Sequence, residues 1–128
     1  SEYYRDLVNT STINTFTLSY ADRHRREILS RYKTFDKFDK SFVFDKAAVN
    51  ELIAMGEKNG VHYNDEGFKA SSDAIQEIMK GLISRDLWGL NEYFRVVNKT
   101  DAAVNKAYKI LNDAQLYNEI LGFEKTLK

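Results

Sequence analysis

Apolar side chains recur at helical spacing along most of this chain, and no proline interrupts them. Between Ser11 and Tyr32, at about 100° per residue, the apolar residues fall on one broad arc. The residues opposite are polar or charged: Thr15, Ser19, Asp22, Arg23, Arg26 and Ser30. Proline removes a helical hydrogen bond and kinks or ends a helix, so its absence from 128 residues suits a chain built of helices. We therefore predict an all-α fold, a single bundle-like array of five to six helices.

Capping residues indicate where helices begin and end in the first half of the chain. Ser11 or Thr12 is expected to begin a helix that runs to about Tyr32, and Thr34 to cap a short helical turn. A further helix is predicted over residues 46–59, ended by Gly60.

The second half is predicted to contain a long helix from Asn64 to about Asn98, with a break near Gly67 or Ser71 left open. Thr100 is then expected to cap another helix, and residues 114–123 to form the last one.

Two short segments, residues 42–44 and 61–63, read as extended and each precedes a helix-capping residue, Asp45 or Asn64. They could pair as a tiny two-stranded ribbon. They could equally be two separate loops that lead into helices, with apolar side chains packed at the helix start. Both alternatives stay open at the level of sequence.

The composition excludes several classes of function. A length of 128 residues fits one domain, 1–128, and a hydrophobic fraction of 43% is enough for a core. Lys+Arg and Asp+Glu are both 19, so the global basic excess typical of nucleic-acid binders is missing. There is no cysteine, which excludes disulfides, thiolate metal sites and a cysteine nucleophile. No apolar run approaches the ~20 residues of a membrane span.

The stretch GLISRDLWGLNEYF, residues 81–94, holds the one tryptophan and an aspartate among apolar residues. Helical spacing places Asp86 in the middle of the apolar arc, so it needs a partner if it is buried. A catalytic acid or base is one interpretation. The stronger one is a buried polar structural residue, paired with Arg25 or His24. Gly81 and Gly89 suggest close approach by another helix.

Trp88 projects away from the main apolar arc. Such an aromatic meets either a second layer of its own domain or another protein surface, and the sequence does not choose between them. In the second case Arg85, Trp88, Glu92 and Arg95 would form a contact face toward another domain.

The remaining candidates favour ordinary structural roles. His24 and His62 lack metal-ligand spacing, and no metal or cofactor site is predicted. The basic stretch 22–33 could meet phosphate through Arg23, Arg25, Arg26 and Arg31. It more often forms a solvated helix face, with pairs such as Asp22–Arg26 and Glu27–Arg31. No nucleophile elbow or phosphate-binding loop is present, so no catalytic residue is assigned.

Five segments, taken in order, resemble a known family. They are YYRDLVNTSTINTFTLSYADRHRREI (3–28), YKTFDKFDKSFVF (32–44), ELIAMGEKNGVHYNDEGF (51–68), LISRDLWGLNEYFRVVN (82–98) and AVNKAYKILND (103–113). Together they are similar to the helical tail that follows the protease core in bacterial carboxyl-terminal processing peptidases, also called tail-specific proteases. The similarity lies in the pattern of helices and includes no catalytic signature.

The resemblance implies a non-catalytic C-terminal fragment of a longer serine peptidase, whose own hydrolytic site uses a serine and a lysine. Its partner would be the protease core of the parent chain or a second subunit, with protein substrates reached through the parent. Its place would be the bacterial cell envelope, in the periplasm. A stand-alone helical interaction module is the alternative. Nucleic-acid binding is a third and weaker interpretation, and an independent enzyme is weaker still.

Overall fold

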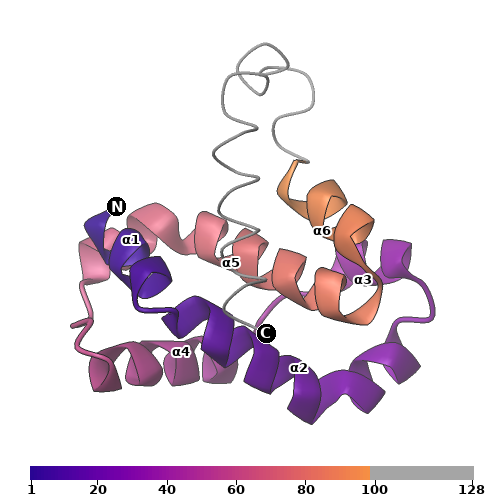
Figure 1. The fold of residues 1–128 in the computed structure, drawn as a ribbon, viewed down its shortest axis with the longest axis horizontal. Coiled ribbons are helices and arrows are strands. Elements are labelled where there is room, and N and C mark those ends of the chain that lie inside the picture. The colour runs from indigo at the N-terminus through magenta and orange to yellow at the C-terminus, as the bar shows by residue number, and fades with distance from the viewer. Residues whose placement is uncertain (99–128) are drawn as a thin grey trace. The chain divides into compact units, whose positions relative to one another are not determined.

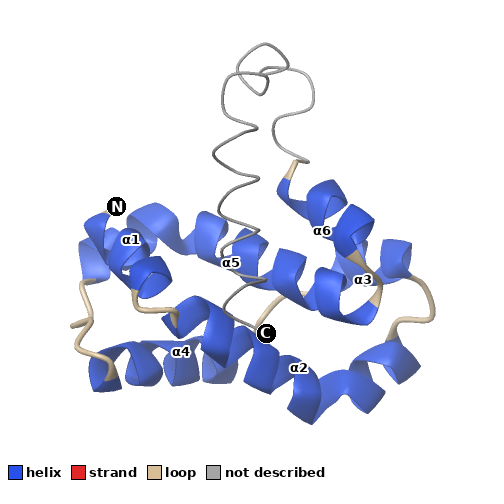
Figure 2. Ribbon diagram, in the orientation of Figure 1, coloured by secondary structure: helices blue, strands red, loops and turns tan. Residues whose placement is uncertain are grey.

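The computed structural model describes residues 1–98, and these form six α-helices (Figure 1). Helix α1 spans Glu2–Asn9, α2 spans Thr12–Arg31 and α3 spans Phe35–Ser41. The all-α prediction is confirmed for the described residues, in which no strand is present (Figure 2). The two C-terminal helices expected after Thr100 lie outside the described residues.

The other three helices follow in order: α4 spans Lys46–Lys58, α5 spans Asp65–Leu87 and α6 spans Leu90–Val97. Helix α2 contacts α1, α4 and α5, and α5 also contacts α1 and α6. Helices α2 and α5 therefore form the centre of the fold, with the shorter helices packed around them (Figure 1).

Three of the predicted caps are formed by local hydrogen bonds, whereas Ser11, at the start of α2, makes no side-chain capping bond. Thr34 accepts from the amide of Lys37, Asp45 from that of Ala48 and Asn64 from that of Gly67. Each side-chain oxygen satisfies an amide that has no partner within its own helix. Gly60, at φ +87°, follows the end of α4 as expected.

The ribbon alternative is wrong. Residues 42–45 and 61–64 are both extended loops that lead into α4 and α5, and they form no ladder with each other. Gln76 of α5 takes the place of a strand partner for the first loop. Its amide accepts from the Phe44 N–H and donates to the Phe44 carbonyl, both at 3.2 Å.

The prediction of one long helix over 64–98 is also wrong in one respect. It breaks at Trp88 and Gly89, well beyond Gly67 and Ser71, and Gly89 has a φ of +137° that other residues rarely adopt. The break lets α6 fold back along α5. A Cβ at Gly81 would lie 3.0 Å from Val97 and 3.2 Å from the Tyr93 ring, so Gly81 is the point of close approach.

The core joins side chains from all six helices. Leu7, Phe16, Phe38, Leu52, Met79 and Ile83 are fully buried, and Tyr93 and Val96 of α6 are nearly so. A connected cluster of aromatic rings extends this core around Phe38 and includes Tyr20, Tyr32, Phe35, Phe42, Phe44 and Trp88.

Candidate functional site

The aspartate singled out in the sequence is part of an ion pair. Asp86, in the last turn of α5, accepts a hydrogen bond from Arg25 of α2 at 2.7 Å. Arg25 is one of the two partners predicted for it. The Asp86 side chain is 28% exposed, however, so its predicted burial is wrong. Helix α5 ends one residue later, which brings Asp86 to the rim of the core.

Trp88 meets a second layer of its own domain. Its ring centroid lies 5.7 Å from that of Phe35 and 5.1 Å from that of Phe38, both on α3. The side chain is only partly exposed. Trp88 therefore joins the end of α5 to α3, and this contact decides the question that the sequence left open.

Arg95 of α6 also contacts α3. Its guanidinium donates to Asp36 at 2.8 Å and lies 4.8 Å from the centroid of the Phe35 ring. Arg85 and Glu92 are half-buried. Of the four residues predicted to form a contact face, Trp88 and Arg95 thus bind α3 within the domain.

A buried ion pair adds a further tie to α3. Lys80 of α5 lies 3.1 Å from the Asp39 carboxylate, and its ammonium also donates to the Asp39 carbonyl. The two side chains are 19% and 8% exposed. A buried charge needs such a partner, so this pair fixes α3 against α5.

The basic stretch of α2 is partly neutralised by carboxylates. Arg23 pairs with Glu51 of α4 at 3.2 Å, and Arg25 pairs with Asp22 as well as Asp86. The i,i+4 pairs predicted for Asp22 and Glu27 are wrong. Asp22 instead pairs with Arg25 and Glu27 with His24, three residues away in each case.

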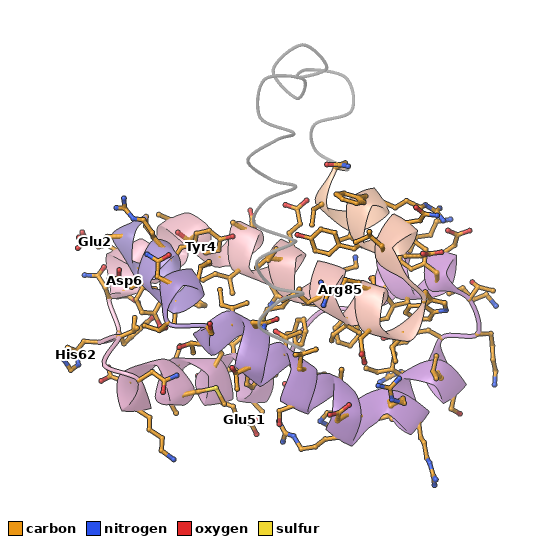
Figure 3. The ribbon with its side chains drawn as sticks, in the orientation of Figure 1. Glu2, Tyr4, Asp6, Glu51, His62 and Arg85 are labelled. Atoms are coloured by element: carbon orange, nitrogen blue, oxygen red, sulfur yellow. The ribbon has the colours of Figure 1, made fainter. Side chains whose placement is uncertain are left out.

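A cavity of about 380 Å³ lies between α1 and the loop before α5, and we call it the α1 cavity. Ser1, which caps α1, lines it together with Glu2, Tyr3 and Asp6 of α1. Residues 60–62 and Asn64 line it from the loop, and Gly67 from α5. Glu2 and Asp6 lie at the same end of the helical array as His62 (Figure 3). The sequence did not predict this cavity, because its walls come from segments far apart in the chain.

The rim of the α1 cavity is held by charged hydrogen bonds. Glu57 accepts from the Tyr63 amide at 2.6 Å and lies 3.1 Å from the His62 ring. These two contacts, the backbone bond first, hold the pKa of Glu57 below its ordinary value. Lys69 and the Tyr63 hydroxyl likewise lower the pKa of Asp65.

The family model described as "Family of unknown function (DUF8443)" matches residues 3–89. The chain belongs to this family. The matched segment covers α1 from Tyr3 onward, α2 to α5, and the turn at Gly89. Neither the comparison with curated proteins nor that with solved structures found a match.

Within residues 1–98, no three histidine, aspartate or glutamate side chains converge as a metal site would require. No helix in this part of the chain has the length and apolarity needed to cross a bilayer.

Proposed function

We propose that this DUF8443 chain is a non-catalytic helical domain that acts by packing on another protein domain. Its sequence resembles, from Tyr3 to Asp113, the helical tail of carboxyl-terminal processing serine peptidases. Its partner is then the protease core of the same parent chain or of a second subunit. There the domain braces the core or limits access to its cleft, and the resemblance implies a periplasmic setting.

One observation carries this proposal: Asp86, Trp88 and Arg95 of the segment 85–95 join helices within the domain. Asp86 ties α5 to α2, and Arg95 ties α6 to α3. Trp88 packs between α5 and α3. Groups used in this way support an architectural role, since a catalytic acid or base needs access to a substrate.

Because Trp88 and Arg95 contact α3, the contact face predicted from the sequence is reduced to its other residues. Arg85 and Glu92 remain as half-buried candidates, and Leu90 is 40% exposed between them in sequence. We assign the contact with the protease core to this smaller face, which lies where α5 turns into α6.

The size of the native gene product tests the proposal. An antibody raised against this domain is used to blot fresh extracts of the source cells. A band several times larger than 14.9 kDa is expected, since the domain would be one part of a peptidase. A single band at 14.9 kDa would overturn the fragment proposal.

That second outcome would favour a stand-alone helical interaction module. The observation on its side is that Leu29 and Val43, far from the α5–α6 turn in sequence, are 42% and 70% exposed. A groove-binding or helix-binding module would present such side chains as one continuous apolar patch.

A further inference from the structure

Asn59, the residue that ends α4, is the one asparagine in the chain that a glycine follows. Asparagine deamidates most readily before glycine, because glycine has no side chain to hinder attack on the asparagine amide. Both residues of this dipeptide are exposed, so water reaches them. The Asn59–Gly60 dipeptide is therefore a place where the chain can change covalently without an enzyme.

The backbone around this dipeptide forms a Schellman motif, a common way for a helix to end. The Gly60 amide donates to the Glu57 carbonyl at 3.1 Å, and the Val61 amide donates to the Gly56 carbonyl at 2.7 Å. Gly60 has a φ of +87°, in the left-handed region that this motif uses. The backbone nitrogen that would attack the side chain of Asn59 is thus already engaged in a hydrogen bond.

The side-chain amide of Asn59 begins a chain of hydrogen bonds into the turn between α1 and α2 (Figure 1). Its Nδ2 donates to the hydroxyl of Thr12 at 2.9 Å. The hydroxyls of Thr12 and Thr10 are 2.7 Å apart, and Thr10 donates to the carbonyl of Asp6 at 2.8 Å. Each hydroxyl has one proton, so Thr12 is the donor to Thr10 and needs its own donor, which is Asn59. The chain therefore runs in one direction.

From this arrangement we propose that Asn59 is a site of spontaneous deamidation, and that its bond to Thr12 sets how fast it reacts. In the reaction the Gly60 amide nitrogen gives up its proton and attacks Cγ of Asn59. The Cγ–Nδ2 bond breaks and Nδ2 leaves as ammonia, taking up a proton in place of the one lost, which closes a succinimide ring. Water then opens the ring at either carbonyl and leaves an aspartate or an isoaspartate. Water is the one co-reactant, and nothing is oxidised or reduced.

The fold restrains both reacting groups. The Schellman motif holds the Gly60 amide, and Thr12 holds the side chain of Asn59. Attack therefore requires the end of α4 to open locally, and the rate follows the fraction of time that it is open. Thr12 is a positioning residue here, because it acts through the side chain that reacts.

Deamidation removes one bond from the chain of hydrogen bonds. A carboxylate has no N–H, so the protons of Thr10 and Thr12 are left to make bonds that needed three donors. Thr12 is 0% exposed, so water does not replace the lost donor. The new negative charge also lies at the C-terminal end of α4, where the helix dipole disfavours an anion. Because deamidation is irreversible, the loosened junction of α1, α2 and α4 accumulates as the chain ages.

The purified 128-residue chain is incubated at neutral and mildly alkaline pH, and peptide mapping by mass spectrometry follows aspartate and isoaspartate at each asparagine. The internal reference is Asn50, which is exposed on the same helix and precedes a glutamate. Asn59 is expected to react about ten-fold faster than Asn50. Equal rates at the two positions would overturn the site.

Thr12→Val keeps the shape of the side chain and removes the acceptor for Asn59. It should raise the rate at Asn59 by about five-fold, the effect of one neutral hydrogen bond. Thr17→Val is the matched control, since Thr17 is equally buried on α2 and its hydroxyl has no partner among residues 1–98. It should leave the rate unchanged.

Two further measurements separate local release from unfolding. Thr12→Ser keeps the hydroxyl and should restore the parent rate, and in concentrated urea the parent chain and Thr12→Val should react equally fast. An unchanged rate in folded Thr12→Val, or equal acceleration by Thr12→Val and Thr17→Val, would overturn the role of Thr12.

Asn59→Asp reproduces the unbranched product and tests its effect on the fold. Its melting temperature should be about 3–6 °C below that of the parent chain, because one hydrogen bond is lost. Asn50→Asp makes the same change within α4 and should lower the melting temperature less. Equal melting of Asn59→Asp and the parent chain would overturn the loosening of the junction. The site lies within residues 6–61, so none of these outcomes depends on the peptidase proposal.

Discussion

Arg25 and Asp86, 61 residues apart in the chain, form a 2.7 Å ion pair that joins the middle of α2 to the last turn of α5. The two side chains are 43% and 28% exposed, so water and salt screen their attraction. The pair therefore positions the end of α5 more than it stabilises the fold. The same end of α5 carries Trp88 and the turn into α6.

A double-mutant cycle with Arg25→Gln and Asp86→Asn should give a coupling energy of about 0.2–1 kcal/mol. The free energy of unfolding is measured by urea denaturation, and the coupling should fall in high salt. The matched control is the cycle on Arg25 and Asp22, which are 3.4 Å apart with Asp22 76% exposed. Coupling there should be smaller, and a larger value would contradict this assignment of partners.

Trp88→Ala should lower the free energy of unfolding by about 2–4 kcal/mol, because it removes the ring that packs on Phe35 and Phe38. Circular dichroism in urea measures the loss, since the variant has no tryptophan fluorescence. Trp88→Phe keeps an aromatic ring and should cost about 1 kcal/mol. If Trp88→Ala unfolds like the parent chain, the ring is instead free for a partner protein.

How much of this could be read from the sequence depends on the range of the interactions. The caps at Thr34, Asp45 and Asn64 were predictable, because each side chain bonds an amide only three residues away. The break at Gly89 was missed, because the apolar spacing continues across it. At this break Gly89 has a positive φ, and α6 packs back onto Gly81, a contact distant in sequence from the break itself.

The candidate site was likewise predictable only in part. Arg25 was predicted as a partner for Asp86, since both residues have helical positions that the sequence fixes. The burial of Asp86 was wrong, because helical spacing cannot show that its helix ends one residue later. The α1 cavity left no local signal, since Asp6 and His62 meet only through tertiary packing.

Gly81→Leu should destabilise the domain by about 1–3 kcal/mol, even though glycine is a poor helix former. A side chain at this position would push against Val97 and Tyr93, which lie 3.0 and 3.2 Å from the site of its Cβ. Thermal unfolding measures the effect. Ala74→Leu adds bulk at an exposed position of the same helix and should be nearly neutral. Equal stability of the two variants would show that α6 does not pack on Gly81.

Glu57→Gln should lower stability at neutral pH and have little effect in acid. The pKa of Glu57 is held below its ordinary value of 4.5, mainly by the hydrogen bond from the Tyr63 amide and then by His62. A carboxyl whose pKa is lower in the folded state stabilises the fold above its unfolded pKa, and this contribution is lost as the pH falls through the folded pKa. The melting temperatures of the parent chain and of Glu57→Gln are measured from neutral to acid pH. The difference between these two temperatures should shrink below pH 4.5.

His62→Gln is the control variant for Glu57→Gln. It leaves the bond from the Tyr63 amide, the larger cause of the lowered pKa, in place. The variant should therefore keep most of the parent chain's dependence on pH. Complete loss of that dependence would mean that the imidazole, and not the backbone, holds the Glu57 carboxylate.

Gln76→Leu should cost about 2–4 kcal/mol, because it leaves both the N–H and the carbonyl of Phe44 without a partner. Phe44 is 3% exposed, so water does not readily replace the lost amide. Gln76→Glu is the informative comparison: a carboxylate still accepts from the Phe44 N–H but repels the Phe44 carbonyl, so its cost should be intermediate. Hydrogen exchange of the Phe44 amide gives the local readout, with fast exchange expected in Gln76→Leu and protection kept in Gln76→Glu. Slow exchange in both variants would mean that the extended loop 42–45 is held by its aromatic contacts alone.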